Sequence, residues 1–323
     1  MADTKISALP AGAPSQQTDA LPVARSGSDY KLTIADVLTA DEHPTYSLYD
    51  DQSSDPSAPA SGIKLYNRPL ANRRLLRFIG PSGLDSALQP AFFANNVTMW
   101  LPGTGTTAAI NFGVSWTNAT TQAHPSIANT NWMTQMKRAT YTTTTTAANA
   151  SGVRTTAPIC WIGSSAGQGG FFFAARFGIL TYTSTMRVFV GLAANSGILA
   201  GDPSAQASSC GMSKDTGETV WQCLTVNATP AATKISTGRT TQAAGTTDVF
   251  DFYMFCKPND TTIYFRVTDL TTSTNLVNNT GQSSTLPANN VMLYAHAECM
   301  NVAGGAGSAV AIFLNKLYIE SDT

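Results

Sequence analysis

Apolar residues recur at every second position in several short segments of this chain, and this alternation most constrains the fold. It is clear in residues 186–192 and 250–256, and a third alternating segment, 263–267, follows the turn-forming Lys257-Pro258-Asn259-Asp260. A period of two places neighbouring side chains on opposite faces of a strand, so these segments are predicted to be half-buried strands. The segments 250–256 and 263–267 are expected to form a hairpin.

The same pattern continues to the end of the chain. Residues 291–299 alternate, and so do residues 309–320, where the phase slips near Asn315 and predicts a β-bulge. Many short strands separated by Gly, Asn and Thr favour an all-β sandwich. The only helix expected in it is a short one near residues 131–138. The absence of a fixed internal repeat disfavours a solenoid.

The first 40 residues have a different character. They predict two short strands around the turn Ser26-Gly27-Ser28-Asp29, and a capping box at Thr33 predicts one or two helical turns as far as Leu38. Such a unit is too small to hold a core of its own, so we expect it to be an arm that docks on a partner. The residues expected to make the contact are Ile6, Leu9, Pro10, Leu21, Pro22, Val23, Tyr30, Leu32, Ile34, Val37 and Leu38.

The remaining organisation follows from composition. Residues 41–62 are rich in Asp and Pro and are expected to be a solvated linker, which leaves residues 63–323 as the sandwich. No stretch reaches the roughly 18 apolar residues that would span a bilayer. Residues 1–10 lack the basic start and apolar run of a secretory signal, so synthesis in a cytoplasm is expected.

Charge argues against a nucleic-acid partner. The formal net charge is −1, and charged residues make up 12% of the chain, against about 25% in typical domains. The densest basic group is Arg68, Arg73, Arg74 and Arg77. Without a basic surface field, these arginines are expected to solvate one side of a strand.

The cysteines predict a reduced core. The five are Cys160, Cys210, Cys223, Cys256 and Cys299. An odd number without a tight pairing pattern fits buried thiols, although a bridge between Cys210 and Cys223 outside the cell stays an alternative.

Catalytic motifs are weak, and the chain is predicted not to be an enzyme. Gly163-Ser164-Ser165-Ala166-Gly167 matches a nucleophile elbow, but the glycines and aromatic residues after it do not begin a helix. No Asp or Glu occurs in the 116 residues between Asp85 and Asp202, which disfavours two-carboxylate glycoside cleavage. Tyr294, His296 and Glu298 share one side of a strand and remain a weaker catalytic alternative. The three histidines lack metal-ligand spacing, so neither a metal nor a cofactor is expected.

A binding site needs fewer precisely positioned chemical groups than a catalytic site does. Tyr264, Arg266, Tyr294 and His296 share the polar phase of their strands and are the predicted surface-binding residues. A face of this chemistry is expected to bind a surface sugar weakly, near the millimolar level that corresponds to about 4 kcal/mol.

Self-association is also expected. Val249, Tyr253 and Phe255 lie on the side of their strand opposite the alternating series Phe250 to Cys256, so both faces of that strand are apolar. A sandwich usually leaves its outer face polar, and a neighbouring subunit is the expected cover, with a homotrimer as the best estimate.

Two regions resemble structural proteins of tailed bacteriophages. The arm, with Lys5-Ile6-Ser7-Ala8-Leu9-Pro10 and Tyr30-Lys31-Leu32-Thr33-Ile34-Ala35-Asp36-Val37, is similar to the N-terminal segment of many tail fibres and other virion proteins. Within residues 70–323, Gly169-Gly170-Phe171-Phe172-Phe173 and Met186-Arg187-Val188-Phe189-Val190-Gly191-Leu192 resemble segments of phage tail or fibre proteins.

The resemblance implies a lectin-like jelly-roll sandwich on the exterior of the particle. The arm would contact other virion proteins of the capsid, collar or tail, and the outer domain would contact the host surface, with a glycan as the expected ligand. The alternative is a head fibre or cement protein that decorates and stabilises the capsid without binding the host.

Overall fold

The computed structural model describes residues 20–25, 28–33, 50–57, 59–79, 85–87, 96–103, 110–118, 122–166, 168–241, 248–302 and 308–321. The chain divides into two compact units, Met1–Asp50 and Asp51–Thr323. In the first unit, β1 (Ala20–Arg25) and β2 (Ser28–Thr33) form an antiparallel hairpin that pairs Arg25 with Ser28. The predicted hairpin is therefore confirmed, whereas the predicted helical turns after Thr33 lie outside the described residues.

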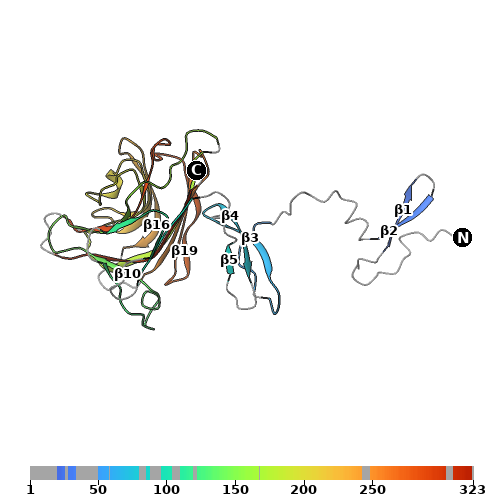
Figure 1. The fold of residues 1–323 in the computed structure, drawn as a ribbon, viewed down its shortest axis with the longest axis horizontal. Helices are drawn as coiled ribbons and strands as arrows, with labels where there is room; N and C mark the ends of the chain where they lie inside the picture. Colours follow the sequence, from blue (N-terminus) through green and yellow to red (C-terminus); the bar gives the residue numbers. More distant parts are fainter. Residues whose placement is uncertain are drawn as a thin grey trace. The chain divides into compact units, whose positions relative to one another are not determined.

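The second unit is an all-β sandwich, as predicted, in which two large sheets share one core (Figure 1). One sheet has nine strands. Along its main path these are β19 (Thr274–Gln282), β18 (Ile263–Asp269), β17 (Phe250–Cys256), β12 (Phe171–Thr181), β21 (Ala311–Ser321), β10 (Ala139–Thr142) and β9 (Gln122–Ala123), and β6 (Asn96–Leu101) pairs with β21 and with β7 (Ile110–Phe112).

The opposite sheet has seven strands. In spatial order these are β16 (Ala232–Thr240), β15 (Val220–Val226), β14 (Ser209–Lys214), β13 (Arg187–Ala193), β20 (Tyr294–Met300), β11 (Ala150–Thr155) and β8 (Trp116–Asn118). A third, smaller sheet contains β3 (Lys64–Leu70), β4 (Arg73–Ile79) and β5 (Asp85–Ala87). The short 3₁₀ helix η3 spans Pro203–Ala205.

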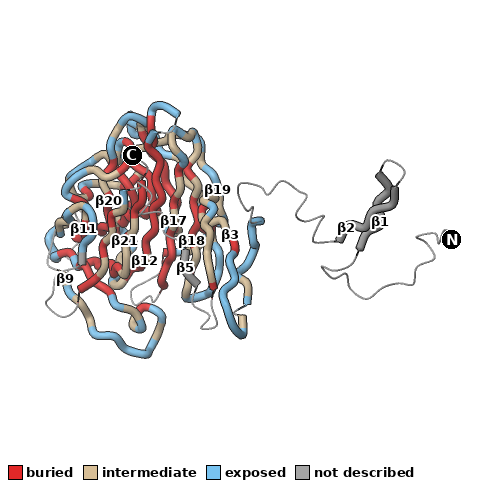
Figure 2. The backbone as a smooth tube through the Cα atoms, turned by 45° about the vertical axis from the view of Figure 1, so that its right-hand side comes forward, coloured by how far each residue is buried: buried red, intermediate tan, exposed pale blue. Residues whose placement is uncertain are grey.

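The main core contains the inward residues of the two large sheets, and Figure 2 shows buried residues concentrated in their strands. The rings of Phe177, Trp221 and Phe250 meet there, with centroids 5.5–6.1 Å apart. The five cysteines are free and buried, as expected for a reduced core.

Segments of this chain also cover the outer faces of the two large sheets. On the seven-stranded sheet, Ile198 and Leu199 pack with a second apolar cluster around Phe189. On the nine-stranded sheet, Met133 packs with Val249 and Phe313 in a third cluster. The expectation that a neighbouring subunit must cover Val249 is therefore wrong, because the segment that carries Met133 lies on it.

The segment that carries Met133 is not helical. Residues 131–136 form turns in place of the predicted short helix. Asn131 accounts for the difference, since its side-chain oxygen accepts a hydrogen bond from the Thr134 amide at 3.0 Å and its carbonyl accepts a second bond from the Thr134 hydroxyl. Such local side-chain bonds compete with helical backbone bonds.

The predicted linker also ends earlier than expected. Asp51 forms an isolated bridge with Asn67 and pairs with Arg74, and Asp55 pairs with Arg68 and Arg77. Three of the four arginines predicted to solvate a strand thus neutralise acids of the predicted linker, and the compact unit begins at Asp51 rather than at residue 63.

Arg73 should hold the three-stranded sheet in place. Replacing it with Met leaves the Glu320 carboxylate, whose side chain is 3% exposed, without its cationic partner, and should lower the free energy of unfolding by about 3 kcal/mol. The control is Arg74→Met, since that side chain is 61% exposed and its loss should cost at most about 1 kcal/mol. Equal losses in urea unfolding would contradict this role.

Candidate binding site

The three-stranded sheet lies over the outer face of the nine-stranded sheet, and Arg73 joins the two. Its guanidinium donates two hydrogen bonds to the Glu320 carboxylate, one of them 2.7 Å long. The same group lies over the ring of Phe172, 4.8 Å from its centroid, and 5.9 Å from that of Phe255. A bidentate ion pair combined with cation–π contacts fixes both position and orientation.

The register of three adjacent strands, β17, β12 and β21, places the outward residues beneath this sheet in three rows. The first row is Phe255, Phe172 and Glu320; the second is Tyr253, Ala174 and Tyr318; the third is Asp251, Arg176 and Lys316. Arg73 covers the first row. The second and third rows extend beyond that contact.

A groove of about 290 Å³ opens at these rows. Leu75 of β4 and Leu101 of β6 form part of its lining, together with Ala174, Tyr253 and Tyr318. Burial raises the pKa of both tyrosines, so their hydroxyls stay neutral donors at physiological pH. A mostly apolar concavity with a few polar groups is the usual form of a small-molecule site.

The predicted bulge at Asn315 determines which residue enters the groove. The register along β12 passes from Arg176–Lys316 to Phe177–Leu314, so Asn315 is the extra residue. The bulge allows Leu314 and Leu317 both to point into the core, while Lys316 reaches the groove. Bulges often redirect a side chain in this way near functional sites.

Lys316 has an unusual environment for a surface lysine. No hydrogen bond or ion pair within the described part of the chain reaches its ammonium group. Burial lowers the pKa of Lys316, and the neighbouring Arg176 guanidinium lowers it further, while Asp251 acts in the opposite direction. Arg176 itself is bound to Asp251 by two hydrogen bonds of 2.6 and 2.7 Å. Sequence reasoning missed Lys316, although the phase slip at Asn315 was the signal for it.

The four predicted surface-binding residues do not form one site. Tyr264 and Arg266 lie on β18 of the nine-stranded sheet, whereas Tyr294 and His296 lie on β20 of the seven-stranded sheet. Their strands turn Ile263 and Ala295 into the shared core, so the two pairs face opposite sides of the sandwich.

Two of these four residues are also buried. Arg266 is 8% exposed and donates a 3.5 Å hydrogen bond to the Pro69 carbonyl of β3. His296 is 0% exposed, with Nε2 2.9 Å from the Asn195 carbonyl oxygen. The prediction that Arg266 and His296 form a surface contact is therefore wrong, since chain segments that the strand pattern could not reveal cover both.

His296 and Glu298, the residues of the weaker catalytic alternative, are covered by the chain in the same way. Nδ1 of His296 lies 3.3 Å from Oε1 of Glu298, and both side chains are fully buried. Oε2 of Glu298 accepts a 2.8 Å hydrogen bond from the Leu199 amide. This pair holds the 195–199 segment against the sheet, and a substrate cannot reach it without displacing that segment.

The anchoring residues predicted in the arm are described only in part. In the hairpin register, Leu21 pairs with Leu32 and Val23 pairs with Tyr30. Between these two pairs in the ladder, Pro22 pairs with Lys31. Ile6, Leu9, Pro10, Ile34, Val37 and Leu38 lie outside the described residues.

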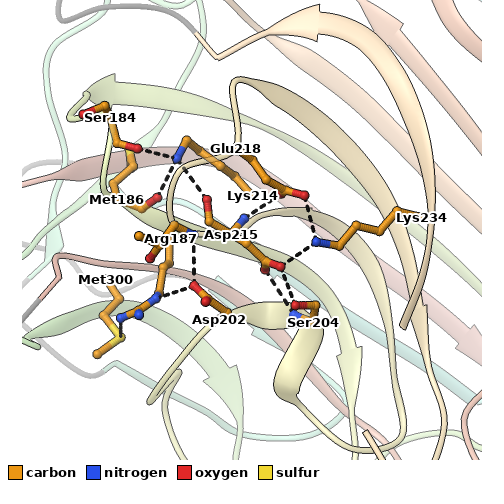
Figure 3. Close-up of polar contacts among 11 residues, drawn as sticks. Ser184, Met186, Arg187, Asp202, Ser204, Lys214, Asp215, Glu218, Lys234 and Met300 are labelled. Carbon is orange, nitrogen blue, oxygen red and sulfur yellow. Dashed lines mark hydrogen bonds and ion pairs between the residues drawn. The ribbon is translucent and has the colours of Figure 1, made fainter. Parts of the chain in front are cut away.

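A second polar cluster lies near one end of β14 (Figure 3). Lys214 is fully buried, and its ammonium donates hydrogen bonds of 2.9 Å to the carbonyls of Ser184 and Met186 and of 3.1 Å to that of Asp215. Lys234 pairs with Asp215 and Glu218. Because its three donors are occupied by backbone carbonyls, Lys214 serves to join neighbouring turns.

Lys214 should therefore be a stability residue. Lys214→Met leaves three carbonyls without their donor and should lower the free energy of unfolding on the order of 3 kcal/mol. The matched control, Lys234→Met, removes ion pairs of a side chain that is 27% exposed and should cost about 1 kcal/mol. Chemical denaturation of both variants checks this, and a larger loss in the control would contradict it.

Within the described ranges, no three His, Cys, Asp or Glu residues are placed to hold a metal ion, and no described helix is long and apolar enough to cross a membrane.

No family model and no curated protein matches the chain. Among solved structures, it is similar to a protein of unknown function from Shewanella oneidensis, with 13% identity over 70% of this chain and 86% of that chain and a TM-score of 0.45. It is also similar to arcelin-5, a lectin-like defence protein from Phaseolus vulgaris, with 7% identity over 71% and 98% of the two chains and a TM-score of 0.43. Lectin II from Ulex europaeus shares 14% identity over 65% and 93%, with a TM-score of 0.42.

Proposed function

We propose that this chain is a non-catalytic structural protein of a phage virion, attached through its N-terminal hairpin and displaying its sandwich outside the particle. The observation that carries the proposal is the hairpin of β1 and β2. It belongs to a unit separate from the sandwich, and its register pairs Leu21 with Leu32 and Val23 with Tyr30, four of the residues expected to anchor the chain. An isolated two-stranded hairpin is at best marginally stable in water, so a separate hairpin of this kind favours a docking role.

The chemistry of the groove supports a role without catalysis. Glu320 is the only carboxylate among the described residues that line it, and Arg73 and the Tyr318 hydroxyl bind that carboxylate. Asp251, one row further, is paired with Arg176. Glycoside cleavage usually needs two available carboxylates flanking the bond, and this arrangement does not offer them.

The resemblance of the arm to phage virion proteins supports the proposal that the chain belongs to a virion. A fibre or appendage, with three copies as the expected state, would be present in a few tens of copies, whereas a capsid decoration would require on the order of hundreds because capsids repeat their subunits by symmetry. Quantitative mass spectrometry of purified particles separates the two roles.

The apolar residues of the hairpin should be required for incorporation. In particles assembled with the variant, Val23→Asp should reduce the copy number at least tenfold, since burying an unpaired carboxylate in an interface is costly. Lys31→Asp is the matched control, because Lys31 is a charged residue that pairs with Pro22 between the two apolar pairs. This variant should be incorporated normally.

Quantitative immunoblots of purified particles read out the result. Normal incorporation of Val23→Asp, or of a chain without residues 1–40, would show that the hairpin is not the anchor.

A further inference from the structure

We propose that the groove between β4 and the outer face of the nine-stranded sheet binds a saccharide that carries a carboxylate, with the Lys316 ammonium on that carboxylate. This goes beyond the proposed function, which concerns attachment through the arm. The ligand class follows from three properties of the groove: its unused donors, its shape and its charge.

Two polar groups in the groove lack partners in the described part of the chain. These are the Lys316 ammonium and the Tyr253 hydroxyl, and both residues line the groove. A half-buried ammonium that makes no direct ion pair within the described residues favours an anion, because the charge gains more from a partner where water is partly excluded. The hydroxyl adds a hydrogen-bonding position suited to a polyhydroxylated ligand.

The shape suits a single sugar ring. Ala174 pairs with Tyr253 on one side and with Tyr318 on the other, so the two tyrosines lie two strand spacings apart, about 10 Å. The small Ala174 side chain leaves room between them. Both rings are half-buried and held by Phe172, whose centroid is 6.3 Å from each. Rigid rings beside a shallow floor provide apolar contacts for the C–H face of a pyranose.

The charge balance favours a carboxylate over a phosphate. Arg73 is committed to Glu320 and Arg77 interacts with Asp55, so Lys316 supplies the uncommitted positive charge. Phosphate recognition typically uses guanidinium forks or several convergent donors. A single ammonium, with its compact charge, matches the single charge of a uronic or sialic acid.

The direct test is titration of the full chain with three acidic sugars. The probes are the methyl glycosides of glucuronic, galacturonic and N-acetylneuraminic acid, each compared with its carboxyl methyl ester by calorimetry and ligand-observed NMR. At least one acid should bind near the millimolar level, and its ester should bind at least tenfold more weakly.

Variants locate the site. Lys316→Met should weaken binding of the acid at least tenfold, and Lys316→Arg should retain it. Lys257→Met, at an exposed position in the turn after β17, is the matched control and should bind like the wild type. Ala174→Leu fills the floor and should abolish binding of acid and ester alike. Thermal unfolding of each variant verifies that it is folded.

Three results would overturn the proposal: no binding of any acid in the panel, equal binding of acid and ester, or unchanged binding by Lys316→Met. None of these three results would contradict the attachment proposal, because incorporation into particles is measured separately. Conversely, specific binding by a chain that never enters particles would refute the attachment role and leave the groove assignment intact.

Discussion

The apolar outer face of the nine-stranded sheet is the constraint on which much of this structure depends. Phe172, Tyr253 and Phe255 point away from the core of the sandwich, and leaving them in water would be unfavourable. The chain covers part of this face with its own three-stranded sheet, which Arg73 holds through Glu320 and the Phe172 ring. Because Glu320 is almost fully buried, the contact is selective: the carboxylate gains the Arg73 guanidinium as its partner only when β4 lies in this position.

Self-coverage changes the interpretation of both outer faces. On the seven-stranded sheet, the buried His296 and Glu298 bind the segment 195–199, so polar residues there fasten a covering segment. On the nine-stranded sheet, the cover stops short of the row that contains Lys316, and the groove lies at that boundary. The trimer that was expected from the apolar faces stays a prediction. Val249 no longer supports it, because Met133 of the same chain packs against this residue.

Some of this could be predicted from the sequence, because strand periodicity and turn chemistry are local. The hairpin of β1 and β2, the alternating strands and the bulge at Asn315 are all present where the residue pattern indicated them. The same pattern could not assign strands to sheets. Tyr264 and Tyr294 share a polar phase but lie on opposite sides of the sandwich.

The candidate site was harder to predict from the sequence, because it also depends on how distant strands pair. Its floor combines Ala174, Tyr253 and Tyr318 from three strands that are distant in sequence. Arg266 and His296 looked exposed because alternation indicates only which face a residue occupies. Whether that face is covered depends on long-range contacts such as the one between Arg266 and Pro69.

The central claim is that the chain itself covers the outer face of the nine-stranded sheet. Amide hydrogen exchange across residues 73–79, measured over a wide range of protein concentrations, tests it most directly. Strong protection of β4 that does not change on dilution is the expected result, since the contact with Glu320 is intramolecular. Protection that disappears on dilution, while β12 and β17 remain protected, would mean that the cover comes from another molecule and would contradict the account.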